Sequence, residues 1–148
     1  MSGNLIGIAR ALEIGAPLEE IPSAAISVDA GVEGDARGRK PLRQVTVLFR
    51  EGWEDACRDL GAEVPWVKRR ANLYVANLDR PRTSGGRLRI GDVELEVTKE
   101  TAPCHLMDRA HEGLRVALQP DWRGGVCCSV VNGGEVRLGD RVEYDPPP

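Results

Sequence analysis

The chain has 148 residues, which is long enough to bury one hydrophobic core and gives no reason to expect a second domain. Its net charge of -3 argues against a general nucleic-acid binder, and three Trp, two Tyr and one Phe are too few to stack single-stranded bases. No segment approaches the length of a membrane span, and the N-terminus lacks a basic segment followed by an apolar run. We therefore expect a cytoplasmic protein with a single domain over residues 1–148, in which residues 145–148 form a frayed tail.

The first half of the chain carries apolar runs that are typical of short strands. These runs lie at residues 5–9, 24–28, 45–49 and 71–75. Between the last two, apolar residues recur at helical spacing, at Trp53, Ala56, Cys57 and Leu60. Gly61 follows them, so we expect a helix that ends at this glycine and places Cys57 in the core.

A basic loop precedes the strand predicted at 45–49. Residues 37–43 contain no carboxylate but four cations, Arg37, Arg39, Lys40 and Arg43. Such a run is usually solvated, but it is also suited to receive a phosphate, because guanidinium groups donate paired hydrogen bonds to phosphate oxygens. Farther along, Asn72 lies two residues beyond Arg70, on the same face of an extended chain, so both side chains are able to address one ligand.

The most informative stretch is residues 93–108, where a strand pattern gives way to a helix pattern. Apolar residues alternate with polar ones over 93–98, as in a strand with one buried face. An apolar residue then recurs at every fourth position, at Leu106, Ala110, Leu114 and Leu118, which predicts one helix interrupted by Gly113. Cys104 therefore lies at a strand-to-helix switch, where unpaired N–H groups and the helix dipole favour the thiolate. A free cysteine is also commonly a small buried hydrophobe, so both interpretations stay open.

The C-terminal part adds further strand and turn signals. Cys127 and Cys128 lie in the apolar run 126–131, where successive side chains point to opposite faces, so at most one faces a given site and at least one is structural. Gly-Asp pairs at 91–92 and 139–140 lie between alternating runs and predict two hairpins. Four cysteines without a C-x-x-C pair do not imply disulfides in a reducing compartment. Many short strands with only two helices predict a closed or nearly closed antiparallel β-barrel.

Several short motifs occur in order along the chain. They are Gly34-Asp35, Arg43-Gln44-Val45, Arg69-Arg70-x-Asn72-Leu73-x-Val75, Leu88-x-Ile90-Gly91, Pro103-Cys104-x-x-x-Asp108, and Arg123-Gly124-Gly125 followed by Gly133-Gly134-x-Val136-x-x-Gly139-Asp140. Together they resemble the MOSC domain, which is named for the C-terminal domain of molybdenum cofactor sulfurase. The resemblance covers nearly the whole chain and implies a mainly β fold with flanking helices, a β-barrel of the MOSC type that is similar to the pyruvate-kinase β-barrel.

The resemblance also implies a site. It suggests that Cys104 carries sulfur or ligates the molybdenum of a molybdopterin cofactor, as a soft thiolate can, and that Asp108, about one helical turn away, orients a partner. The side chains that the resemblance places around the anionic cofactor are Arg43, Arg70, Asn72, Thr101 and Arg123.

The implied activity is sulfur transfer or a molybdenum-dependent reduction of N-hydroxylated compounds, with a redox or sulfur-donor protein as partner. Relatives with the latter activity carry an additional N-terminal β-barrel domain, whereas this sequence starts almost directly at the barrel. We therefore expect part of such a pocket to be missing or to be supplied by another subunit.

Three other interpretations remain open. A metal-independent cysteine hydrolase or transferase would use Cys104 with His105 or His111 as base, although one is adjacent and the other lies roughly 10 Å along a helix. A zinc site of Cys104, His105, His111 and Cys127 matches no common spacing, so no zinc is expected. A non-catalytic binding module would present the basic loop to an acidic partner. No nucleic-acid or membrane partner is expected.

Overall fold

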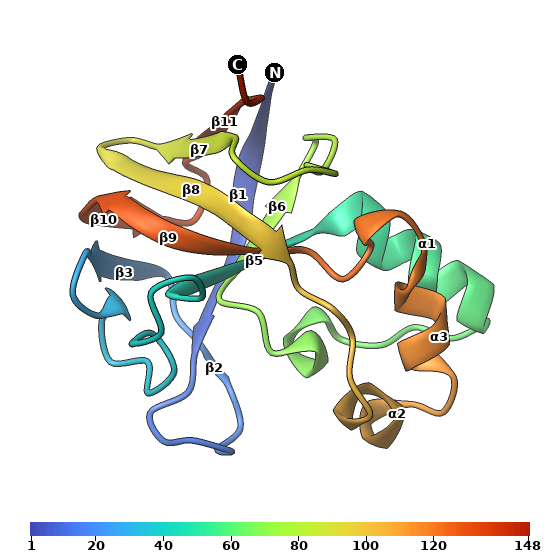
Figure 1. Ribbon diagram of the computed structural model, residues 1–148. Coiled ribbons are helices and arrows are strands. Elements are labelled where there is room, and N and C mark those ends of the chain that lie inside the picture. Colours follow the sequence, from blue (N-terminus) through green and yellow to red (C-terminus); the bar gives the residue numbers. More distant parts are fainter.

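Seven strands close into a barrel in the computed structural model, which describes residues 1–148 (Figure 1). The strands are β1 (Ser2–Arg10), β5 (Val45–Phe49), β6 (Leu73–Ala76), β7 (Arg87–Ile90), β8 (Val93–Glu100), β9 (Val126–Asn132) and β11 (Arg141–Asp145). Around the barrel the order is β11-β7-β8-β9-β5-β6-β1, and β1 pairs with β11 to complete it. The predicted mainly β, closed barrel is confirmed. One neighbouring pair, β5 and β6, is parallel, which corrects the expectation of a purely antiparallel barrel.

The crossover between the two parallel strands contains the longest helix. Parallel neighbours need a long connection, and here it consists of α1 (Arg50–Leu60) and a short 3₁₀ helix, η1 (Trp66–Arg69). Gly61 ends α1 as predicted, with a φ of 76° that suits glycine and with its N–H donated to the last carbonyls. η1 was not predicted. Arg70 follows it with a φ of 67°, so β6 begins at Leu73 rather than at residue 71.

A small second sheet lies beside the barrel. It has the order β10-β3-β4, with β3 (Ser23–Ser27), β4 (Gly31–Val32) and β10 (Gly134–Arg137), while β2 (Glu19–Glu20) pairs with the end of β1. The hairpin predicted at 91–92 is confirmed, since β7 pairs with β8. The hairpin predicted at 139–140 is wrong. β10 pairs with β3, and β11 pairs with β7 and β1, so this turn carries the chain from the small sheet into the barrel.

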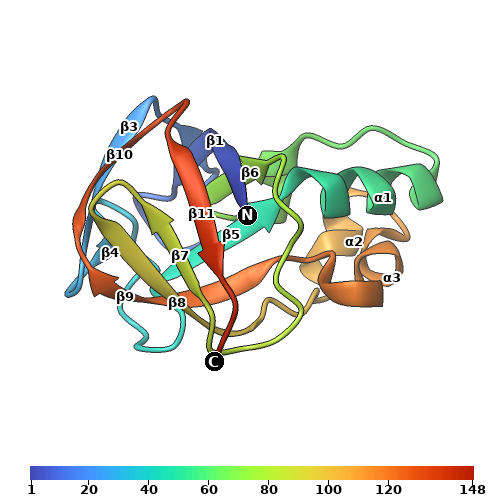
Figure 2. The same ribbon diagram turned by 90° about the horizontal axis from the view of Figure 1, so that it is seen from above.

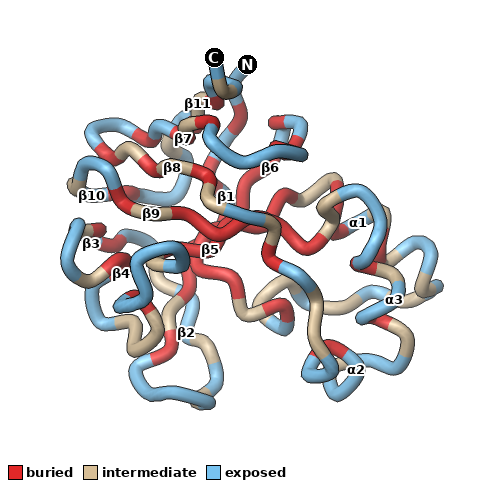
Figure 3. Tube along the Cα trace, in the orientation of Figure 1, coloured by how far each residue is buried: buried red, intermediate tan, exposed pale blue.

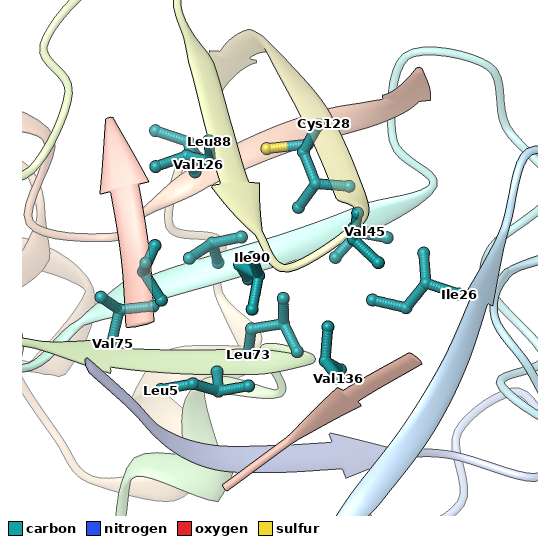
Figure 4. Packing of buried hydrophobic residues seen from close by; sticks show 14 of the residues in the cluster. Leu5, Ile26, Val45, Leu73, Val75, Leu88, Ile90, Val126, Cys128 and Val136 are labelled. Carbon is teal, nitrogen blue, oxygen red and sulfur yellow. The ribbon is translucent and has the colours of Figure 1, made fainter. Parts of the chain in front are cut away.

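The barrel interior is filled by one hydrophobic cluster (Figure 4). It contains the inward-facing residues of the alternating strands, among them Leu5, Val45, Leu73, Leu88 and Cys128. Cys128 is fully buried there, and burial raises the pKa of its thiol. Cys127 points to the other face of β9, where its Sγ lies 3.3 Å from the Oγ1 of Thr101. The prediction that the two cysteines face opposite sides is therefore confirmed.

The helices lie together on one side of the barrel (Figures 1 and 2). They bury a second, smaller cluster against its outer wall, which includes Leu48, Trp53, Met107, Leu114 and Leu118. Figure 3 shows the helices as mixtures of short buried stretches and exposed ones. Cys57 is partly buried against this cluster, in agreement with its assignment to the core. No helix is both long enough and apolar enough to cross a membrane.

The single helix predicted over residues 106–118 is wrong. The structure has two short helices, α2 (Leu106–Ala110) and α3 (Leu114–Leu118), followed by a 3₁₀ helix, η2 (Pro120–Trp122). Gly113 separates them with a φ of 88°, a conformation that glycine adopts without steric cost. Only half of the predicted apolar stripe is buried: Leu114 and Leu118 of α3 are, whereas Ala110 is half-buried and Leu106 is exposed. In α2 the buried residue is instead Met107.

Candidate functional site

Arg69 lies at the centre of the candidate site. It is the last residue of η1, and only 6% of it is exposed. Its Nε donates a hydrogen bond to the carbonyl oxygen of Gly124 at 3.0 Å, and its Nη2 donates to the carbonyl oxygen of Thr101 at 2.6 Å. Its Nη1 lies 3.6 Å from the Sδ of Met107 in α2. One planar guanidinium group therefore holds together three segments that are distant in sequence.

The charge of Arg69 is not balanced by a carboxylate at ion-pair distance. The pKa of Arg69 is lowered to about 10, first by burial and then by the charge of the neighbouring Arg43. The acidic groups of Cys104, Cys127 and Glu100 act in the opposite direction. Arg69 stays protonated at neutral pH. A buried cation without a counter-charge favours an anion beside it.

A narrow crevice opens next to Arg69. It has a volume of about 10 Å³, and its lining includes Arg43, Thr46, Arg69, Arg70, Thr101 and Gly124. Arg43 is exposed and Arg70 is half-buried, and neither guanidinium group forms a hydrogen bond or ion pair with the rest of the chain. Burial lowers the pKa of Arg70, and the charge of Arg37 lowers it further. The structure thus brings the predicted residues Arg43, Arg70 and Thr101 together, with two free guanidinium groups at the mouth.

Asn72 lies in an adjoining crevice that also contains Arg37, Arg43 and Thr46. Its hydrogen-bonding groups are all used within the protein. The amide nitrogen donates to the carbonyl oxygen of Ala9 at 3.2 Å and to Oδ2 of Asp35 at 2.8 Å, and its Oδ1 accepts from the N–H of Thr46 at 3.1 Å. Asn72 therefore holds the segments around the crevice together, and it has no N–H group left to donate to a ligand.

Asp35 connects Asn72 to Arg70. Its carboxylate accepts hydrogen bonds from the Nε and Nη2 of Arg37, and Arg37 in turn donates from Nη1 to the carbonyl oxygen of Arg70 at 2.7 Å. Burial alone would raise the pKa of Asp35, but the hydrogen bonds from Arg37 outweigh it, so the pKa lies below its usual value. Arg70 has a positive φ, which is uncommon for a residue other than glycine. The hydrogen bond from Arg37 to its carbonyl oxygen stabilises this conformation.

Cys104 lies in the turn that leads from β8 into α2. It is half-buried and forms no disulfide, and its carbonyl oxygen accepts from the N–H of Met107, the residue that contacts Arg69. α2 has only five residues, so it supplies little of the helix dipole on which the sequence-based argument for a thiolate rested. The positive charge near Cys104 comes instead from the buried Arg69.

Two of the predicted site residues, Asp108 and Arg123, lie away from the crevice. Asp108 is exposed, and its Oδ1 accepts from the N–H of Arg115 at 3.0 Å, so it caps the first turn of α3. Arg123 forms an ion pair with Asp59 at 2.7 Å and donates to the carbonyl oxygen of Ala117 at 3.0 Å. Both side chains are thus engaged in holding the helices, and neither lines the crevice at Arg69.

The structure does not bring together the Cys–His pair or the zinc ligands that were considered as alternatives. No hydrogen bond joins Cys104 to His105 or His111, and the Nδ1 of His111 lies 3.0 Å from the carbonyl oxygen of Glu112. No group of three or more His, Cys, Asp or Glu side chains is placed to hold a metal ion.

Three contributors to the site were not predicted from the sequence: Asp35 and Arg69, which hold its loops in place, and Thr46, which lines its wall. Asp35 and Arg69 belong to the motifs that resemble the MOSC domain, and their place in those motifs is the only feature of the sequence that points to a role in the site. The largest hollow of the molecule, with a volume of about 700 Å³, shares no lining residue with the crevice. We place the candidate site at the crevice because the unpaired positive charge is there, and because Arg69 in its wall interacts electrostatically with Cys104, which does not itself line the crevice.

Comparison with known proteins agrees with this architecture. The family model of the MOSC domain matches residues 35–143. The crystal structure of the YuaD protein from Bacillus subtilis is similar with a TM-score of 0.83, at 18% identity, over 97% of this chain and 96% of that chain. That of YiiM from Escherichia coli is similar with a TM-score of 0.74, at 18% identity, over 100% of this chain and 71% of that chain. That of YiiM from Geobacillus stearothermophilus has a TM-score of 0.70 at 14% identity, over 97% and 73% of the two chains. A search of curated proteins gave no match.

Proposed function

The chain belongs to the MOSC domain family, and on that premise we propose that it binds a molybdopterin-type cofactor, with the anionic end at the Arg69 crevice and Cys104 as the sulfur residue. The observation that supports this proposal is the pair of unpaired guanidinium groups, Arg43 and Arg70, beside a buried and uncompensated Arg69. Three like charges repel one another, so an anion between them stabilises the arrangement.

The residues present fit the anionic end of such a cofactor. Guanidinium groups bind phosphate in a paired geometry, and Arg43 and Arg70 are free to do so. The crevice itself has room for about one water-sized group, so it would admit a single oxygen of the anion while the remainder lies outside, against the two arginines. A thiolate is a soft ligand that a molybdenum centre accepts, and Cys104 is free for that role.

In this proposal each residue of the site has a separate role. Arg43 and Arg70 bind and orient the anion, and Arg69 supplies positive potential and fixes the surrounding loops. Arg37, which Asp35 orients, holds the carbonyl oxygen of Arg70. When bound, the molybdenum centre would supply the two-electron chemistry that reduces an N-hydroxylated compound.

Sulfur carriage is the second candidate, and it is favoured by the half-buried, disulfide-free thiol of Cys104, which interacts electrostatically with the cation of Arg69. The Cys104 thiolate would attack the outer sulfur of a donor persulfide. The sulfur–sulfur bond of the donor breaks, Cys104 becomes the persulfide, and the donor leaves as its thiolate. Arg69 would stabilise the negative charge on the cysteine before and after transfer.

Co-purification tests both candidates. The wild-type protein, Cys104→Ala, Arg70→Ala and the control Lys68→Ala are isolated from a host that makes molybdenum cofactor. Molybdenum content, pterin fluorescence and the mass of the unreduced protein are then measured. We expect wild type and Lys68→Ala to carry pterin and molybdenum or a persulfide, and Arg70→Ala to lose the pterin. The proposal fails if wild type and Cys104→Ala carry the same negligible amounts of cofactor and neither accepts sulfane sulfur.

A further inference from the structure

The largest hollow of the molecule lies away from the Arg69 crevice, between α1, the loop that follows it, η1 and β6. It is a broad depression that is open to solvent, with a volume of about 700 Å³. Three of its lining residues are aromatic, Trp53, Trp66 and Tyr74. We call it the aromatic hollow. The proposed function makes no use of it, although aromatic residues are few in this chain.

The aromatic walls are held in place. Trp66 and Tyr74 stack with ring centroids 4.9 Å apart and ring planes 8° from parallel. The Nε1 of Trp53 donates to the carbonyl oxygen of Val64 at 3.0 Å, and the Nε1 of Trp66 donates to Oε1 of Glu20 at 3.2 Å. Fixed rings keep their orientation without a ligand, so little conformational entropy is lost when one binds.

Tyr74 presents an unused polar group to the hollow. The residue is only 8% exposed, and its hydroxyl forms no hydrogen bond with the protein. Burial raises the pKa of Tyr74, and the charge of Glu54 raises it further, so the group stays a neutral hydroxyl. The hydroxyl oxygen is not among the buried atoms that lack a partner, so it is reachable from the hollow and is free to accept a hydrogen bond from a group that occupies it.

The charged groups of the hollow favour a cation. Glu63 forms no ion pair, and Glu54 has only a loose contact with Arg50, at 3.6 Å. The one cation in the lining, Arg58, is paired with Asp55 at 2.8 Å. Aromatic faces also attract cations through their quadrupoles.

We propose that the aromatic hollow is a second binding site, which takes a small planar aromatic cation with N–H donors. The ring of Trp66, the most exposed of the three aromatic residues, contacts the flat face of this ligand, while Trp53 and Tyr74, which are only 3% and 8% exposed, contact it through their edges. The carboxylates of Glu54 and Glu63 balance its charge, and the hydroxyl oxygen of Tyr74 accepts one of its N–H groups.

Three quinoline probes of similar shape separate the contribution of the ligand's charge from that of its N–H donors. Protonated 4-aminoquinoline carries both charge and N–H donors, 1,4-dimethylquinolinium carries charge alone, and 4-methylquinoline in slightly alkaline buffer carries neither. We expect affinity by titration calorimetry to fall in that order. In ¹H–¹⁵N spectra, 4-aminoquinoline should shift the indole signals of Trp53 and Trp66 and leave that of Trp122, which packs against the barrel core, in place.

Conservative variants test the assignment without disturbing the packing. Tyr74→Phe should weaken 4-aminoquinoline and leave 1,4-dimethylquinolinium unchanged. Glu63→Gln should weaken both cations about two- to five-fold, as expected for an exposed carboxylate, while Glu13→Gln, outside the hollow, should weaken neither. Arg70→Ala and Cys104→Ala should bind the probes as wild type does, so this inference and the proposed function fail separately. Equal affinity for all three probes, or a shift of Trp122 alone, would overturn it.

Discussion

The guanidinium group of Arg69 donates a hydrogen bond of 2.6 Å to the carbonyl oxygen of Thr101. This contact joins the end of η1 to the loop that leads from β8 to Cys104. The same guanidinium group also binds the carbonyl oxygen of Gly124, before β9. A single buried charge therefore braces the loops around the crevice and adds to the positive potential that Arg43 and Arg70 create there.

Replacing Arg69 should destabilise the protein more than replacing its exposed neighbour. Arg69→Ala removes two charge-assisted hydrogen bonds and leaves two carbonyl oxygens without partners, so we expect the free energy of unfolding to fall by about 2–4 kcal/mol. Lys68→Ala, in the same 3₁₀ helix but exposed, should change it by less than about 0.5 kcal/mol. Urea denaturation measures both. Equal midpoints for the two variants would show that Arg69 does not brace the fold.

Gly124 should not tolerate a side chain. A Cβ at this position would lie 2.6 Å from the carbonyl oxygen of Thr101 and 2.9 Å from Nη2 of Arg69, so it would crowd the contact between them. We expect Gly124→Ala to cost about 1–3 kcal/mol, the usual range for overpacking.

The matched control for Gly124 is Gly15→Ala. Gly15 has a φ of 80° with nothing near its Cβ position, so its substitution costs only backbone strain, about 1 kcal/mol. Thermal unfolding should rank Gly124→Ala as the less stable variant. The reverse order would mean that the loops at Arg69 move apart easily.

Asp35 should stabilise the fold in a pH-dependent way. Its pKa in the folded protein lies below the ordinary value of 3.8, so its contribution is complete at neutral pH and is lost as the pH falls through the folded pKa. We expect Asp35→Asn to be about 1–3 kcal/mol less stable than wild type at neutral pH. The gap should narrow below about pH 4. Denaturation curves at several pH values test this, and a gap that stays constant down to acidic pH would contradict the role of the ionised carboxylate.

Most of the barrel could be predicted from the sequence, because period-2 alternation and turn glycines are local signals. Residues 93–98 lie within β8, and Gly61 ends α1 where expected. The pairing of β10 with β3 could not be predicted, since strand partners are set by contacts distant in sequence. Gly113 was ambiguous for a different reason. A glycine within a helix costs only about 1 kcal/mol, so the sequence does not tell a tolerated glycine from a break.

The candidate site was predicted in part. The resemblance placed Arg43, Arg70 and Thr101 together, and the structure does the same. Arg69 and Arg70 are adjacent residues of the same type, so the sequence does not show which of them is buried. The 3₁₀ helix, which ends at Arg69, buries Arg69 and leaves Arg70 half-exposed. Asn72 looked like a ligand-binding residue, but its amide is satisfied by Ala9 and Asp35, far away in sequence. Long-range contacts of this kind leave no local pattern.

The rate of Cys104 alkylation by iodoacetamide, measured with and without inorganic pyrophosphate, tests the central claim most directly. If Arg43 and Arg70 hold an anion beside Cys104, pyrophosphate should slow the alkylation of Cys104 in wild type and in the control Arg39→Ala. It should have no effect in the double variant Arg43→Ala/Arg70→Ala, and the alkylation of Cys57, on α1, should not change in any of them. An alkylation rate of Cys104 that ignores pyrophosphate in wild type, or that responds equally in the double variant, would contradict the account.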